Sequence, residues 1–310
     1  MSMSEDKYLF GPIPSRRLGL SLGISPIPPK TCNYSCVYCQ LGRTNKMTNE
    51  RQEYVPLEKI IAEFRAFLQR GLAFDVVTIV GEGEPTLALN LGQLITALQE
   101  LTDKPIAVIT NSALISVEEV RTALMPADIV LPSLDAYDEG SFLKVNRPYG
   151  RIKFQEVFEG LRFFSQEYQG QLWLEVMLVN GLNDDRQALL QLKALIAELK
   201  YDRLYLNTPV RAPAESWVRA PSPEVVQKAA QLLGAMTIES LAEGSFYSEI
   251  EDDYEAVLSI IARHPMNQHE IEGFLTSRHC ANVERVWLKL KKNANVEVVS
   301  YKGYDTYRFV

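Results

Sequence analysis

The sequence predicts an α/β protein in which residues 1–241 form a partial (β/α)6 barrel. Six short apolar segments of strand length alternate with segments whose apolar residues recur at helical spacing. The strand segments are almost continuously apolar, which is typical of parallel strands buried on both faces. Six such units suit an incomplete barrel better than a closed barrel of eight.

The predicted elements follow one another in regular order. Strands are predicted at residues 20–27, 75–80, 106–109, 128–131, 172–179 and 204–206, and helices at 57–68, 91–98, from 116 onward, and at 154–161, 184–199 and 221–233. Ser116 with Glu119 predicts a capping box for the third helix, and Asp184 or Asp185 a cap for the fifth. Residues 10–19 hold two prolines and two glycines and are predicted to lack regular structure.

The composition is that of a globular protein, with 46% hydrophobic and 23% charged residues in a chain of 310. No apolar run approaches the roughly 18 residues of a membrane span. Residues 1–8 have no signal-peptide core. These features predict a cytoplasmic location with no membrane partner. The net charge of -7 and the isoelectric point near 5.2 disfavour broad nucleic-acid binding.

Three of the four cysteines, Cys32, Cys36 and Cys39, lie within eight positions after the first strand, in the spacing C-x3-C-x2-C. Clustered cysteines in a chain of this kind indicate a metal site rather than disulfides. Three thiolates with no fourth ligand nearby fit an iron-sulfur cluster with one open iron. Zinc with a distant fourth ligand and three ordinary thiols are the alternatives. The three histidines, His264, His269 and His279, are interpreted as surface or cap residues rather than ligands.

This loop, with Tyr38 before its last cysteine, resembles the cluster loop of the radical S-adenosylmethionine (SAM) enzymes. The resemblance implies that Cys32, Cys36 and Cys39 hold a 4Fe-4S cluster whose open iron binds the amino and carboxylate groups of SAM. Reductive cleavage of SAM would then give methionine and a 5'-deoxyadenosyl radical, which abstracts a substrate hydrogen atom. The superfamily also has the same partial barrel.

Polar motifs follow the predicted strands, where ligands gather in parallel α/β folds. Gly83, Glu84 and Pro85 resemble the Gly-Gly-Glu-Pro motif that holds the amino group of SAM, with Glu82 in place of the first glycine of the commonest form. By the same resemblance, further cofactor-binding candidates are Tyr38, Asn111, Ser133, Asp135, Glu175, Asn180, Asn183, Pro209 and Val210. The Arg16-Arg17 pair is either a solvated surface pair or a pair of cations for an anionic substrate or the carboxylate of SAM.

Within the superfamily, the chain most resembles the wyosine-synthase-like branch. Residues 11–42, 81–87, 132–136, 146–148 and 207–211 carry this resemblance. True wyosine synthases modify transfer RNA with pyruvate and use a second cysteine-bound cluster. Only Cys280 is left over here, so the ligands for a second cluster are missing.

Residues 242–310 are predicted to form a winged-helix-like domain after a boundary near 243–253. Three amphipathic helices, at 254–261, 271–275 and 283–290, precede a hairpin of strands 296–301 and 306–310. Arg285, Lys289 and Lys292 share the face of the third helix opposite its apolar stripe. This face either contacts phosphates, as recognition helices do, or is simply solvated.

The sequence therefore predicts a radical SAM enzyme that acts on a macromolecular substrate, RNA or peptide, recruited by the C-terminal domain. An electron donor such as flavodoxin or ferredoxin is the second expected partner. One alternative is wyosine-type modification of transfer RNA. The other is a nucleic-acid-binding regulator with a metal- or redox-sensing cysteine site, against which the barrel argues.

Overall fold

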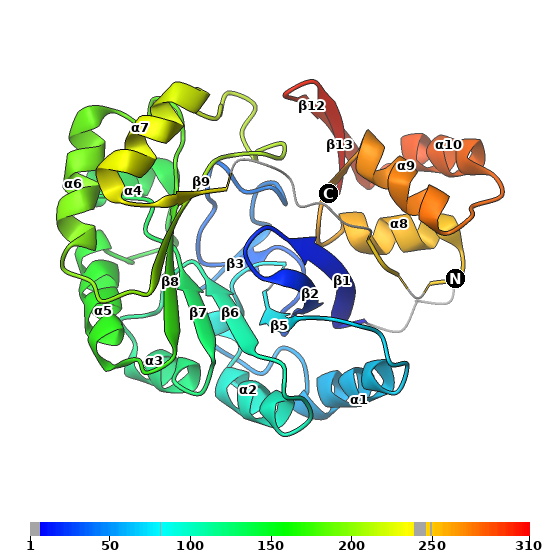
Figure 1. The fold of residues 1–310 in the computed structure, drawn as a ribbon, viewed down its shortest axis with the longest axis horizontal. Helices are drawn as coiled ribbons and strands as arrows, with labels where there is room; N and C mark the ends of the chain where they lie inside the picture. Colours follow the sequence, from blue (N-terminus) through cyan, green and yellow to red (C-terminus); the bar gives the residue numbers. More distant parts are fainter. Residues whose placement is uncertain (1–6, 81, 239–245, 249) are drawn as a thin grey trace.

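The computed structural model describes residues 7–80, 82–238, 246–248 and 250–310 (Figure 1). Its centre is an eight-stranded sheet with the order β1-β2-β5-β6-β7-β8-β9-β10. The strands from β2 onward run parallel to one another. They are β2 (Gly19–Ile24), β5 (Val76–Ile79), β6 (Ile106–Thr110), β7 (Ile129–Pro132), β8 (Gln171–Met177), β9 (Arg203–Asn207) and the short β10 (Met236–Thr237).

Helices cover the outer face of this sheet (Figure 1). They are α1 (Leu57–Leu68), α2 (Leu91–Gln99), α3 (Glu118–Leu124), α4 (Glu139–Val145), α5 (Phe154–Glu167), α6 (Arg186–Ile196) and α7 (Pro223–Leu233). Their apolar stripes and the outer side chains of the strands form one large core that includes Phe64, Leu94 and Phe164. The partial (β/α)6 barrel predicted from the sequence is confirmed.

Two local predictions are wrong. Residues 10–19 were expected to be irregular, but Leu9–Ser15 forms β1, which pairs antiparallel with β2. Prolines are tolerated there because β1 is an edge strand, where one side needs no ladder hydrogen bonds. Helix α3 begins at Glu118, and Val117 at its N-cap makes no side-chain cap, so Ser116 and Glu119 form no capping box. The cap predicted at Asp185 is confirmed at α6.

The C-terminal residues form a second, smaller unit with its own apolar core. It contains α8 (Asp253–Ile261), β11 (Met266–Asn267), α9 (Gln268–Ser277), α10 (Val283–Lys292), β12 (Val296–Tyr301) and β13 (Tyr304–Phe309). Its three strands pair antiparallel in the order β11-β13-β12. The predicted helices and hairpin are present, while the winged-helix assignment stays a prediction. The predicted boundary between residues 241 and 242 lies outside the described residues.

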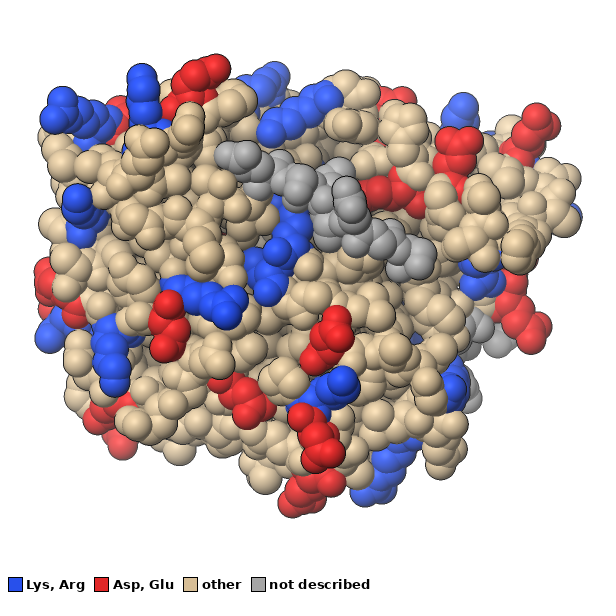
Figure 2. Space-filling view, in the orientation of Figure 1, with Lys and Arg blue, Asp and Glu red and all other residues tan. Residues whose placement is uncertain are grey.

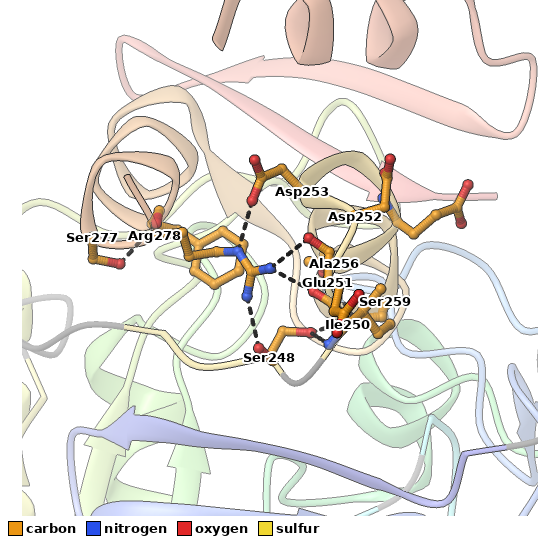
Figure 3. A network of polar contacts seen from close by, with 11 residues as sticks. Ser248, Ile250, Glu251, Asp252, Asp253, Ala256, Ser259, Ser277 and Arg278 are labelled. Carbon is orange, nitrogen blue, oxygen red and sulfur yellow. Dashed lines mark hydrogen bonds and ion pairs between the residues drawn. The ribbon is translucent and has the colours of Figure 1, made fainter. Parts of the chain in front are cut away.

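The side chain of Arg278, at the end of α9, contacts residues around the start of α8 (Figure 3). Its guanidinium lies 2.8 Å from the carboxylate of Asp253 in the first turn of α8 and donates to the carbonyls of Ser248 and Glu251 at 2.7 and 3.1 Å. One planar group with several donors thus binds Ser248, Glu251 and Asp253 together. The segment that leads into α8 is consequently bound to the end of α9.

The C-terminal unit bridges the open side of the barrel, between the β1 edge and the loop of residues 208–222 that joins β9 to α7 (the β9–α7 loop). Arg211 of this loop forms a two-pronged ion pair with Glu270, at 2.8 and 2.9 Å. Tyr301 donates to the carbonyl of Pro209 at 2.9 Å. At the other edge, Arg263 lies 5.8 Å from the ring centroid of Phe10 in β1.

His264 lies in this interface, so its interpretation as a surface or cap residue is wrong. Its Nε2 is 2.7 Å from Arg211, whose guanidinium only donates, so the imidazole accepts this hydrogen bond and is neutral. Burial, with the neighbouring charges of Arg211 and Arg16, holds the pKa of His264 well below its ordinary value of 6.5. The ring of Phe246 lies 5.5 Å away.

This depressed pKa makes the stability of the protein depend on pH. Below pH 6.5 the unfolded chain protonates His264 while the folded chain does not, so stability is lost as the pH falls from 6.5 toward the folded pKa. The loss is at most about 1.4 kcal/mol per pH unit. His264→Gln keeps an acceptor for Arg211 without the titration. We expect thermal unfolding from pH 7.5 to 5.5 to show a smaller decrease in the variant; equal decreases would contradict the assignment.

None of the described helices is both long and apolar enough to cross a membrane.

Candidate active site

A cavity of about 310 Å³ opens at the carboxyl ends of the parallel strands. The loop of residues 30–43, which holds the three clustered cysteines (the cysteine loop), forms one wall. The residues that follow β5, β6, β7 and β9 form the others. Of the predicted site residues, its lining includes Cys32, Cys36, Cys39, Tyr38, Gly83, Glu84, Asn111, Ser133, Glu175, Pro209 and Val210. The fold thus gathers side chains from positions 32 to 210 around one space.

The cysteine loop is shaped by its own backbone and by amide donors from the barrel. Thr31 and Cys32 form β3, which pairs with β4 (Lys46–Met47). The side-chain amide of Asn111 is 3.4 Å from the sulfur of Cys32, and that of Asn146 is 3.6 Å from the sulfur of Cys36. N–H donors aimed at sulfur stabilise a thiolate over a thiol.

The three thiols are half-buried and free of disulfides. Burial raises the pKa of Cys32 to about 12 and raises those of Cys36 and Cys39 as well. Without a bound metal, the three cysteine side chains are therefore thiols at neutral pH. Metal binding at this loop must release their protons, because thiolates are the ligands.

The donor set fits an iron-sulfur cluster better than a single ion. Cys32, Cys36 and Cys39 line one cavity, and neither a fourth cysteine nor a histidine is among its described lining residues. A closed zinc site needs four converging ligands. A 4Fe-4S cluster is wider than one ion and is bound by cysteine thiolates at separate irons, so its ligands need not converge on one point.

The loop after β5 is locked to the cysteine loop at Gly83. A Cβ at Gly83 would lie 1.7 Å from the carbonyl oxygen of Thr31, so only glycine fits this approach. The N–H of Glu84 donates to the same oxygen at 3.1 Å, and the N–H of Lys30 donates to the carbonyl of Glu82 at 2.6 Å. The two predicted motifs are therefore one packed unit.

The carboxylate of Glu84 is 1% exposed and already bonded within the protein. It accepts hydrogen bonds from the hydroxyls of Thr86 and Thr110, at 2.6 and 2.7 Å, and from the N–H groups of Thr86 and Asn111, at 3.0 and 2.8 Å. Burial raises its pKa, against the effect of these bonds. Glu84 thus joins the ends of β5 and β6, and its binding of the SAM amino group stays a prediction.

Four predicted residues lie outside the cavity lining: Pro85, Asp135, Asn180 and Asn183. Asp135 accepts hydrogen bonds from Tyr38, from Asn146 at 3.0 Å and from the N–H of Met177 at 2.9 Å, so it anchors the aromatic residue of the cysteine loop. The Asn183 side chain is fully buried and donates to the carbonyls of Asp135 and Met177. Asn180 is exposed, and Pro85 begins the short 3-10 helix η1 (Pro85–Leu87).

Sequence reasoning missed Glu215, which ties the β9–α7 loop to the cysteine loop. Its carboxylate accepts two hydrogen bonds from Arg43, both at 2.9 Å, and one from Arg147 at 2.5 Å. Its N–H donates to the carbonyl of Val37 at 3.1 Å. No spacing rule connects positions so far apart in the chain, so nothing in the sequence marked this residue.

This fold and this site define the class of the protein, and comparison with known proteins agrees. Residues 27–192 match the Radical SAM superfamily. The chain is 37% identical over 274 residues to the UPF0026 protein MJ1312 of Methanocaldococcus jannaschii, covering 86% of this chain and 85% of that protein. The protein therefore belongs to the radical SAM superfamily, whose enzymes use a 4Fe-4S cluster and S-adenosylmethionine.

Solved structures show the same fold at low identity. TYW1 with a bound lysine-pyruvate adduct superposes with a TM-score of 0.52 at 19% identity, over 69% of this chain and 72% of that one. Streptococcus suis SuiB bound to precursor peptide SuiA gives 0.53 at 16% identity, over 74% and 51%. These structures show the fold, and the family match over residues 27–192 confirms the predicted membership and enzyme class.

Proposed function

We propose that this protein is a cytoplasmic radical SAM enzyme with one cluster, held by Cys32, Cys36 and Cys39, and that it acts on a macromolecular substrate. The single observation that carries the site assignment is the shared cavity, where three cysteines face the residues that end five parallel strands. Membership in an enzyme superfamily, matched over residues 27–192, argues against the alternative of a metal-sensing regulator.

The chain's own residues have distinct parts in this proposal. The amides of Asn111 and Asn146 orient two of the cysteine sulfurs. The backbone around Gly83, with Ser133, lines the space for the methionine part of SAM, and Pro209 and Val210 line the space for adenine. When bound, the cluster supplies the electron that cleaves SAM to methionine and a 5'-deoxyadenosyl radical, which takes a hydrogen atom from the substrate. Flavodoxin or ferredoxin is the proposed source of that electron.

The substrate class is supported by the neighbours and by the C-terminal unit. One neighbour holds a peptide and another a lysine-pyruvate adduct. On α10, Arg285 and Lys292 are exposed, whereas Lys289 lies 4.7 Å from the ring of Tyr254. The face in Figure 2 intersperses acidic and basic side chains and presents no broad basic surface among the residues it colours. A peptide substrate is therefore the leading proposal and RNA the second.

Wyosine-type chemistry remains the second candidate because TYW1 shares the fold. The chain has only one cysteine, Cys280, outside the cysteine loop, so it lacks ligands for a second cluster. Cys280 belongs to the C-terminal core, away from the cavity.

The proposal is tested by SAM turnover. Anaerobically reconstituted protein reduced with dithionite should form 5'-deoxyadenosine and methionine slowly without substrate, as measured by liquid chromatography with mass spectrometry. The control omits dithionite and should form neither. Protein that contains a full cluster, binds SAM and yet gives no 5'-deoxyadenosine would refute the proposed function.

A further inference from the structure

A second cavity of about 190 Å³ adjoins the active-site cavity inside the barrel. Arg16, Arg17 and Arg211 line both cavities and form part of the wall between them. The second cavity extends toward β1, β2 and the C-terminal unit, where Arg263 and His264 also line it. None of the three clustered cysteines is in its lining.

Among the residues that the structure describes, three of the four arginines in this second cavity have a carboxylate partner. Arg17 is paired with Glu175, Arg211 with Glu270, and Arg263 with Glu82 at 3.5 Å. Arg16 has a different kind of partner. Its guanidinium donates to the backbone carbonyl of Ile238 at 3.4 Å, and no carboxylate among the described residues pairs with it.

Burial and neighbouring positive charge lower the pKa values of two of these arginines. Burial, then the charge of Arg211, lowers the pKa of Arg16 to about 10. Burial, then the charge of Arg16, lowers the pKa of Arg17 to about 10 as well. Both groups remain cationic at neutral pH, and each is destabilised by its surroundings. Because Arg17 is already paired with Glu175, an anion in the second cavity would chiefly relieve the cost at Arg16.

We propose that this second cavity binds an anionic group of the substrate, a carboxylate or a phosphate, and so places the substrate beside the active-site cavity. Guanidinium groups match both oxyanions with two parallel hydrogen bonds. The proposal rests on the proposed function, since it assumes that SAM fills the first cavity.

The carboxylate of SAM is the other source of the same chemistry. In the radical SAM enzymes that this chain resembles, that carboxylate binds the open iron of the cluster, which would lie beside the three cysteines. The lining of the second cavity includes Gln40 and Leu41 but none of the three clustered cysteines, and it extends toward β1, β2 and the C-terminal unit. Because Arg16, Arg17 and Arg211 line both cavities, phosphate binding in the presence of saturating SAM distinguishes the two sources.

The test uses inorganic phosphate as the probe and the full-length, cluster-loaded protein under anaerobic conditions. Calorimetric titration should show phosphate binding in the presence of saturating SAM. Arg16→Gln should weaken it by about tenfold or more, the scale of a charge-assisted hydrogen bond. Arg16→Lys should bind between the two. Arg65→Gln is the matched control, because it removes one exposed positive charge from α1 outside both cavities and should leave phosphate affinity unchanged.

A second measurement needs no variant. Phosphate should protect Arg16 from modification by phenylglyoxal, mapped by mass spectrometry, while Arg65 is modified equally with and without phosphate. This measurement decides the question even if Arg16→Gln fails to fold.

Two results would overturn the inference. One is the absence of phosphate binding and of protection in the wild type. The other is displacement of phosphate by SAM together with weaker SAM binding in Arg16→Gln, which would assign Arg16 to the carboxylate of SAM. Formation of 5'-deoxyadenosine is measured on the same samples. If the wild type forms no 5'-deoxyadenosine, the proposed function is refuted. The phosphate titration tests the second cavity independently of that result.

Discussion

Alanine in place of Cys32, Cys36 or Cys39 is expected to abolish the iron-sulfur absorption band of the reconstituted protein. In the proposed site each cysteine supplies one of three ligands, and a cluster with one open iron has no ligand to spare. Wild-type protein should contain about four irons per chain. The measurements are iron and sulfide content with the visible absorption spectrum, all taken anaerobically.

Cys280→Ala is the matched control. Cys280 lies against the C-terminal core and does not line the cavity. Its replacement should leave iron content and spectrum unchanged. Loss of half the iron in this variant would show a second cluster and reject the single-cluster proposal.

Gly83→Ala is expected to be the most damaging substitution at a position that supplies no ligand. Its Cβ would lie 1.7 Å from the carbonyl oxygen of Thr31, a backbone atom that cannot move aside like a flexible side chain. The loop after β5 must separate from the cysteine loop, which breaks the bonds at Glu84 and Lys30. We expect a loss of about 3 kcal/mol or more in stability, in the upper range for overpacking. Iron content after reconstitution should fall with it.

Gly273→Ala provides the comparison. Gly273 lies within α9, and a Cβ there meets no atom within 4 Å. Alanine in a helix interior should stabilise the protein by up to about 1 kcal/mol. Thermal unfolding and iron content of the two variants are measured side by side. A Gly83→Ala protein with wild-type stability and a full cluster would show that this contact does not hold the site together.

Regular hydrophobic patterns made the barrel predictable from the sequence. The central strands β5, β6 and β7 are apolar runs, and the bounds of α1 and β6 match the periodicity within a residue or two. Strand β1 was not predicted, because Pro12 and Pro14 favour irregular backbone. A strand tolerates these prolines here only because β1 lies at the edge of the sheet. The short helix α4 was not predicted, because its seven residues are too few to show a clear helical periodicity.

The site was predictable where a motif is local. The cysteines and Gly83 are each marked by their neighbours in the chain. Asn180 and Asn183 show the limit of this reasoning, because a polar residue after a strand serves equally well to bond the backbone, as Asn183 does. Glu215 and the Arg211–Glu270 pair depend on contacts between distant segments, which no single-sequence pattern encodes.

The β9–α7 loop is held from both sides, by Glu215 at the cysteine loop and by Arg211, Pro209 and Ala220 at the C-terminal unit. The cysteine loop and the C-terminal unit therefore both contact this one segment, and their free energies are linked if docking and loop ordering both depend on it. By reciprocity, a partner that binds the docked form preferentially also stabilises the loaded cysteine loop, and loading the loop tightens docking by the same amount. Substrate capture at the C-terminal unit would then commit the enzyme to chemistry only when the substrate is present.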